Sequence, residues 1–162
     1  MYTGNPGHLK SFNYVGFHRY SLTFCTYQRQ PLFVREPVVT SVLLQISRAG
    51  VEQRFAVVAY CFMPDHLHLL VAGQSEASDC KCFIARVKQY SGHDYSKQFQ
   101  GRLWQRYGFE HVLRDDELTL AVARYILNNP IRAGLVQDAG DYPFVGSLVY
   151  ELEDLLDGIR SG

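Results

Sequence analysis

The segment Tyr60–Val71, which reads Tyr-Cys-Phe-Met-Pro-Asp-His-Leu-His-Leu-Leu-Val, constrains the fold of this chain more than any other segment does. Two apolar runs meet at Pro64-Asp65, a pair typical of a tight turn, so the pattern predicts a β-hairpin. Successive side chains of a strand point to opposite faces, which puts His66 and His68 on one face. Two neighbouring imidazoles are either half of a metal site or a pair of structural histidines, and the spacing alone leaves both interpretations open.

Alternating and helical patterns elsewhere in the chain predict the elements around this hairpin. These elements are a strand over Tyr20–Tyr27, helices over Pro37–Ala49 and Cys80–Phe99, an irregular stretch or short strand within Gly101–Arg114, a helix from Asp115 to about Asn129, and a short helix over Tyr150–Leu156. We expect Gly50 to stop the first helix and Pro130 to stop the third. The order predicts an α+β fold, in which helices pack on one face of an antiparallel sheet of the ferredoxin-like kind.

The length of 162 residues and the hydrophobic content of 47% predict one domain over residues 1–162. Within it, residues 1–13 are predicted to be an N-terminal loop, and residues 149–162 an acidic tail or short helix. Apolar runs are too short to span a membrane, and the first residues lack the order of a signal peptide, so we expect a cytoplasmic protein without membrane association. The four cysteines have neither disulfide-framework nor zinc-site spacing.

The net charge of zero conceals an uneven distribution of charged residues along the chain. Residues 1–114 hold 13 Lys and Arg against 7 Asp and Glu, whereas residues 115–162 hold 3 against 9. Such a split indicates one surface for a polyanion and an acidic C-terminal part, the alternative being a chance division over a solvated surface.

The most basic part of the chain, residues 81–114, is also rich in aromatic side chains. Cations for phosphates and flat rings for unstacked bases are what a protein that binds single-stranded nucleic acid needs. The candidate nucleic-acid-binding residues are Arg86, Lys88, Arg102, Trp104, Arg106 and Arg114. Of these, Trp104 is equally consistent with a core residue.

The helix that ends near Pro130 carries a second candidate group. Tyr125 and Asn129 are one turn apart, on the stripe predicted to face the sheet. A phenol beside an amide oxygen, held against two imidazoles, would supply a nucleophile and a His-His-Asn ligand set for Mg²⁺ or Mn²⁺. The plainer alternative is a core tyrosine and an Asn-Pro helix stop. Tyr90, with Asp94 four residues later, is an equal candidate for the nucleophile, and spacing does not choose between the two tyrosines.

Longer motifs occur in a fixed order along the chain. They are Met63-Pro-Asp-His-Leu-His-Leu-Leu70, Gly101-Arg-Leu-Trp-Gln-Arg-Tyr107, Arg124-Tyr-Ile-Leu-Asn-Asn-Pro-Ile-Arg-Ala-Gly-Leu-Val136 and Asp141-Tyr-Pro-Phe144. Over residues 14–148 the chain resembles the single-tyrosine HUH transposases, and most of all the REP-associated tyrosine transposases. The resemblance implies an HUH fold, His66 and His68 as metal ligands, Asn129 completing the metal site, and Tyr125 as the nucleophile.

The same resemblance implies a metal-dependent enzyme that cleaves and rejoins single-stranded DNA near hairpins through a covalent 5′-phosphotyrosine. Its metal would be Mg²⁺ or Mn²⁺, and its DNA a REP-like hairpin or an insertion-sequence end. The alternative is a non-catalytic nucleic-acid-binding module on the same fold. Whether the protein works as a homodimer or a monomer stays open. The chain departs from the family at Leu127, where relatives often carry a polar residue or histidine, and at Val145-Gly146, which replaces a Ser-rich ending.

Overall fold

The computed structural model describes residues 12–113 and 119–160 of the chain. Its helices and strands are, in order, β1 (Arg19–Cys25), α1 (Glu36–Gln53), β2 (Phe55–Met63), β3 (His66–Gly73), α2 (Cys80–Phe99), β4 (Phe109–Leu113), α3 (Thr119–Leu127), α4 (Asn129–Arg132), β5 (Val145–Gly146) and α5 (Leu152–Arg160). Short 3₁₀ turns lie between β1 and α1 and before β5. The predicted helix Cys80–Phe99 is confirmed, and it continues through Gly92.

The five described strands form one antiparallel sheet in the order β4-β1-β3-β2-β5. Its centre is the predicted hairpin β2–β3, which turns at Pro64-Asp65. Strand β1 pairs with β3 so that Thr23 lies opposite His68 and Cys25 opposite His66. Because facing residues of paired strands point to the same side of the sheet, Thr23 and both histidines share one face.

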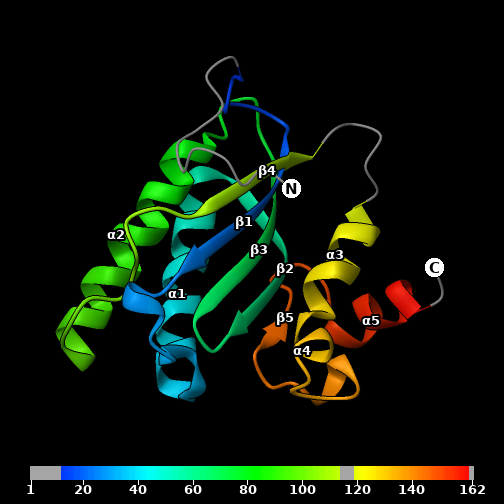
Figure 1. Cartoon of the computed structure of the whole chain (residues 1–162). Coiled ribbons are helices and arrows are strands. Elements are labelled where there is room, and N and C mark those ends of the chain that lie inside the picture. Colours follow the sequence, from blue (N-terminus) through cyan, green and yellow to red (C-terminus); the bar gives the residue numbers. More distant parts are fainter. Residues whose placement is uncertain (1–11, 114–118, 161–162) are drawn as a thin grey trace.

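Helices cover both faces of the sheet, as Figure 1 shows, with α1 and α2 on one side and α3, α4 and α5 on the other. One hydrophobic core lies under α1 and α2 and includes Tyr20, Leu22 and Phe83. A second core lies between the opposite face and α3 and α5, and includes Cys61 and Leu127. The α+β antiparallel prediction is confirmed, but the expectation of helices on a single face is wrong, because the apolar side chains of α3 and α5 bury the other face as well.

The first helix differs from its prediction at its C-terminal end. Gly50 does not stop α1, which continues to Gln53 and is capped by Arg54 in the left-handed conformation (φ 57°). The reason is steric: a Cβ at position 50 would lie 3.0 Å from the carbonyl oxygen of Phe55, so Gly50 provides room for the start of β2. This glycine therefore serves helix–strand packing and not helix termination.

The helix that carries Tyr125 also differs from its prediction. Helix α3 ends at Leu127, and Pro130 stands in the first turn of a separate short helix, α4. Proline has no N–H to donate in a helix interior but is well suited to a first turn, so the chain bends here and starts again. The predicted start of this helix, Asp115 to Glu117, lies outside the described residues.

Candidate active site

The two histidines of β3 lie on the face of the sheet that α3 partly covers, with ring centroids 4.8 Å apart and planes at 88°. The Asp65 carboxylate accepts a hydrogen bond from Nδ1 of His66 at 2.7 Å. Nδ1 of His68 is hydrogen-bonded to Oγ1 of Thr23 at 3.0 Å. With Nδ1 of each ring engaged in this way, Nε2 is the nitrogen that can present a lone pair to a metal ion.

The carboxylate that orients His66 is itself held in place by the loop after β1. Arg29 donates from Nε to Asp65 Oδ2 at 3.0 Å, and the Thr26 hydroxyl and backbone N–H both donate to the Asp65 carbonyl at 3.0 Å. Burial alone would raise the pKa of Asp65, but the hydrogen bonds from His66 and Arg29 outweigh it and lower this pKa. The ionised carboxylate and the Arg29 guanidinium thus form a chain that fixes the orientation of His66.

The second histidine is kept neutral by its surroundings. Burial lowers the pKa of His68 to about 3, and the nearby His66 and Arg132 act in the same direction. A neutral imidazole is the form that binds a metal ion, so the His68 environment favours ligation over charge at physiological pH.

Tyr125 lies over the same face of the sheet, near β1 and β4. It lines a pocket of about 420 Å³ together with Ser21, His111, Ala121 and Val122. Ser21 and Thr23 are successive same-face residues of β1, about 6.6 Å apart along the strand, and Thr23 holds His68. Tyr125 and the histidine pair are thus connected through two successive same-face residues of β1.

The prediction that Tyr125 points inward is only partly correct, because 56% of the side chain is exposed. The buried stripe of α3 consists instead of Ala123, Ile126 and Leu127. Tyr125 stands at the edge of this stripe, where a phenol can reach both the sheet and an external substrate. Leu127, at the position where relatives often have a polar residue, is fully buried in the second core.

His66 and His68 fit a divalent metal ion if an amide oxygen supplies the third protein ligand. Among the described residues, no group of three or more His, Cys, Asp or Glu side chains could hold a metal ion. A third protein ligand beside His66 and His68 would then be of another type, such as the amide oxygen of Asn129, which suits Mg²⁺ or Mn²⁺. Asn129 is half-buried at the start of α4. The neighbouring Asn128 instead lines a different pocket with Asp138 and Arg160.

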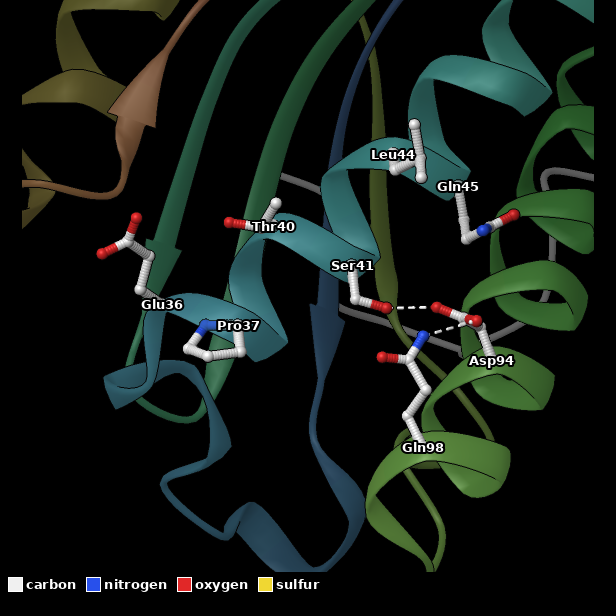
Figure 2. Close-up of a pocket in the computed structure, with 8 residues that line it drawn as sticks. All are labelled: Glu36, Pro37, Thr40, Ser41, Leu44, Gln45, Asp94 and Gln98. Carbon is white, nitrogen blue, oxygen red and sulfur yellow. Dashed lines mark hydrogen bonds between the residues drawn. The ribbon is translucent and has the colours of Figure 1, made fainter.

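The rival tyrosine, Tyr90, belongs to the opposite side of the sheet. Its hydroxyl donates to Glu52 at 2.5 Å, and the Arg48 guanidinium lies 3.7 Å from its ring centroid, both from α1. Its predicted companion Asp94 accepts hydrogen bonds from Ser41 and Gln98 in the hollow between α1 and α2 that Figure 2 shows. Tyr90 therefore joins two helices in the layer that does not face the histidines.

The basic candidates gather around the segment that follows α2. Lys88, Arg102 and Arg106 line a hollow of about 640 Å³, while Arg86 is exposed further along α2, where it donates to Gln89. This segment is joined to the end of β1 that lies beside His66. The Gln105 N–H donates to the Cys25 carbonyl, and Cys25 pairs with His66 across β1 and β3.

Trp104 and Arg114 differ from the other predicted nucleic-acid-binding residues in what the structure shows of them. Trp104 is 6% exposed, and its indole N–H donates to the Ser91 hydroxyl at 2.8 Å. The Trp104 ring packs against Phe24 and Phe33, as expected of a core residue, and Trp104 also lines the hollow with Arg102 and Arg106. Arg114 lies outside the described residues.

One residue near Tyr125 was not singled out from the sequence. The Arg132 guanidinium lies 3.9 Å from the Tyr125 ring centroid and donates to the Tyr125 carbonyl at 2.6 Å. Its only signal in the sequence is its place in the motif Arg124–Val136.

None of the described helices is long and apolar enough to cross a bilayer.

Comparison with known proteins places this geometry in context. A protein of Haemophilus influenzae, provisionally named as a REP-associated tyrosine transposase, is 32% identical over 101 residues, which cover 56% of this chain. The match spans 57% of that relative's own length. A solved REP-associated tyrosine transposase bound to a REP hairpin has the same fold, with a TM-score of 0.71 at 19% identity over 86% of this chain and 81% of that one.

A second solved structure, a protein of Deinococcus radiodurans R1 provisionally described as a transposase, gives a TM-score of 0.50 at 25% identity and covers 75% of this chain and 97% of that one. The family described as "Transposase IS200 like" matches residues 15–129, which include both histidines, Tyr125 and Asn129. The resemblance predicted from the motifs is confirmed, and this chain belongs to the IS200-like transposase family.

Proposed function

We propose that this chain is a transposase that cleaves and rejoins single-stranded DNA next to a hairpin, with Tyr125 as its nucleophile. The observation that carries the proposal is the position of Tyr125 over the same face of the sheet as His66 and His68, next to the strand β1 that holds His68 through Thr23. Membership of the transposase family supports this class of reaction. Tyr90 lies on the other side of the sheet, where its hydroxyl donates to Glu52, and this supports Tyr125 over Tyr90 for the role.

The reaction is a transesterification at one backbone phosphate. The phenolic oxygen of Tyr125 attacks the phosphorus and forms a new O–P bond, and the P–O3′ bond breaks. The departing 3′ oxygen takes up a proton, the phenolic proton passes to solvent, and the 5′ end stays on Tyr125 as a phosphotyrosine. Attack by another 3′ hydroxyl reverses these steps and rejoins the DNA.

His66, His68 and Asn129 would hold Mg²⁺ or Mn²⁺ at this site. Bound there, such an ion neutralises charge on the attacked phosphate and aligns the phosphorus for in-line displacement. The protein contributes the orientation of both imidazoles, through Asp65 for His66 and Thr23 for His68. The neutral state of His68 keeps its lone pair available for the metal.

The DNA substrate is inferred from the basic hollow and from the relatives. Lys88, Arg102 and Arg106 line the hollow, and their segment reaches the strand end beside His66. This arrangement supports a path for a single strand from the hollow to the nucleophile. The solved relative is described as bound to a REP hairpin, so we infer hairpin DNA with a single-stranded flank as the substrate. We propose that the protein meets such DNA in the cytoplasm.

Labelled single-stranded oligonucleotides test the proposal directly. They carry hairpins and flanks from the genomic neighbourhood of this chain, and are incubated with Mg²⁺ or Mn²⁺ and resolved on a denaturing gel. We expect a covalent protein–DNA band from the wild type and from Tyr90→Phe, but none from Tyr125→Phe or His66→Ala. Loss of the band only in Tyr90→Phe would move the nucleophile to α2.

Absence of the band for the wild type on all of these oligonucleotides, with salt-sensitive binding retained, would leave the non-catalytic nucleic-acid-binding module. Size-exclusion chromatography of the same samples, with and without DNA, distinguishes the homodimer from the monomer.

A further inference from the structure

The bend between α3 and α4 brings Arg132 back onto the residue proposed as the nucleophile. In a continuous helix, two residues seven positions apart are separated by about 10 Å along the axis. Here the chain restarts at Asn129, and the Arg132 guanidinium both covers the Tyr125 ring, at 3.9 Å, and donates from Nη2 to the Tyr125 carbonyl, at 2.6 Å. Both contacts are with Tyr125, so Arg132 is fixed relative to this phenol in particular.

The guanidinium is carried by α4, which packs against β2, the strand whose Cys61 lies opposite His68. Burial lowers the pKa of His68, and the charge of Arg132 acts in the same direction. Arg132 therefore lies within electrostatic range of both the candidate nucleophile and a candidate metal ligand. A phosphate attacked by Tyr125 while bound to the metal must occupy this same region.

Arginine has the chemistry to bind such a phosphate. Its planar fork carries five N–H donors and matches the geometry of two phosphate oxygens, and it stays charged at any accessible pH. With Nη2 bonded to the Tyr125 carbonyl, donors on Nε and Nη1 remain for a ligand. Arg132 is exposed, so a DNA strand can reach those donors.

We propose that Arg132 is the phosphate-binding arginine of this site, which contacts the phosphate that Tyr125 attacks and then the phosphotyrosine that results. The inference rests on the proposed function and extends it by one catalytic residue. As the O–P bond to Tyr125 forms and the P–O3′ bond breaks, the guanidinium stabilises the negative charge on the non-bridging oxygens. It exchanges no proton or electron with the DNA.

A purely structural role for Arg132 is the alternative, because an arginine that donates to a carbonyl near a helix C-terminus caps that helix. The chain offers a matched control for this alternative. Arg124, on the same helix, donates from Nε to the Ile159 carbonyl at 2.8 Å. Arg124→Gln thus removes an arginine–carbonyl hydrogen bond of the same kind without removing a group that covers Tyr125.

The test compares Arg132→Gln, Arg132→Lys and Arg124→Gln in two assays, with melting temperatures recorded for each variant. The first assay is the single-turnover rate of covalent adduct formation on the hairpin oligonucleotides with Mn²⁺. The second is the salt dependence of oligonucleotide binding, measured in the Tyr125→Phe background so that no adduct forms. Arg132→Lys keeps the charge but loses the fork, and serves as the folded substitute if Arg132→Gln is unstable.

We expect Arg132→Gln to lower the adduct rate by about 100-fold, with a smaller loss in Arg132→Lys. The slope of log affinity against log salt should also fall by about one in Arg132→Gln, as for the loss of one phosphate contact. Arg124→Gln should change only the melting temperature. Equal losses of rate in Arg124→Gln and Arg132→Gln, or an unchanged salt slope in Arg132→Gln, would overturn the proposal.

The two assays separate this inference from the proposed function. A wild type that forms no adduct rejects the transposase reaction, and the salt slope then decides the phosphate contact alone. A salt slope that falls in Arg132→Gln but not in Arg124→Gln supports the contact between Arg132 and a phosphate. A salt slope that is unchanged in Arg132→Gln rejects this contact too.

Discussion

Replacing Asp65 with asparagine tests whether the hydrogen-bonded chain beside His66 prepares that ring for a metal ion. Asp65 accepts from His66 Nδ1 at 2.7 Å and from Arg29 Nε at 3.0 Å. Asparagine keeps the shape and one acceptor oxygen but loses the charge that makes these hydrogen bonds strong. His66 would then be a weaker ligand with a less defined orientation.

The size of the effect follows from what each contact contributes. Loss of a partner that orients a metal-bound histidine typically lowers metal affinity by about 10–100-fold, which corresponds to about 1.4–2.7 kcal/mol. Because the amide oxygen of Asp65→Asn can still accept from Nδ1, we expect about 10-fold for this variant and up to about 100-fold for Asp65→Ala. The Arg29–Asp65 pair is partly exposed, with side chains 53% and 31% accessible, so its loss should cost less than about 1 kcal/mol of stability.

The assay is a titration of the protein with Mn²⁺ in the absence of DNA, with free Mn²⁺ quantified by its electron paramagnetic resonance signal. His66→Ala serves as the variant without one ligand. Asp79→Asn is the matched control, since Asp79 is a carboxylate that caps α2 by accepting from the Cys82 N–H at 3.1 Å. Asparagine caps a helix about as well as aspartate, so this variant removes a carboxylate charge with little change in stability and should leave Mn²⁺ affinity unchanged.

Asp65 would have no orienting role if Asp65→Asn and Asp65→Ala both bound Mn²⁺ as tightly as the wild type while His66→Ala bound it weakly. In that case His66 would be a ligand that needs no orienting partner. Equal weakening of Mn²⁺ binding by Asp65→Asn and Asp79→Asn would instead attribute the effect to the loss of a negative charge anywhere on the protein, and not to the contact of Asp65 with His66.

The remaining predictions concern stability. In the unfolded chain His68 takes up a proton near pH 6.5, but in the folded chain only near pH 3, so the unfolded state holds the extra proton between these values. The free energy of unfolding of the metal-free protein should thus fall as pH is lowered below about 6.5. Urea titrations at several pH values should show a shallower fall of this free energy with pH in His68→Gln than in the wild type. The same fall in both proteins would contradict the lowered pKa of His68. Gly73→Ala should cost about 1–3 kcal/mol, because its Cβ would lie 2.1 Å from the Gly16 carbonyl oxygen. A Cβ at Gly92 would lie 3.8 Å from its nearest neighbour, so Gly92→Ala should be neutral or stabilising by up to about 1 kcal/mol in the same denaturation assay. Equal losses of stability in Gly73→Ala and Gly92→Ala would argue against the steric explanation. Trp104→Phe should lower stability by about 1–3 kcal/mol through the lost hydrogen bond to Ser91 and lost volume, with DNA affinity of the folded protein unchanged; a tenfold loss of affinity without loss of stability would support the base-stacking role.

Local sequence patterns predicted the elements that local chemistry controls. The hairpin at Pro64-Asp65 and the helix Cys80–Phe99 follow from turn residues and apolar periodicity, which depend on near neighbours in the chain. The period of a strand put His66 and His68 on one face before any partner strand was known. The four motifs in fixed order along the chain, taken together, indicated the family.

Other features depended on contacts between residues far apart in the sequence. Gly50 resembled a helix stop, yet it serves the approach of β2, and Trp104 was equally consistent with base stacking and with the core, where its ring packs. No local pattern encodes these outcomes, because each depends on which surface of another element arrives at that position.

By itself, the sequence determined the fold class, the common face of the two histidines and the family, since each depends on the order and period of residues along the chain. Only the tertiary structure put Tyr125 and Tyr90 on opposite sides of the sheet, joined Arg29 and Asp65 to His66, and brought Arg132 over the Tyr125 ring. The physical reason is that a site is a set of distances between distant residues, and those distances are fixed by packing both faces of the sheet and by the bend at Pro130.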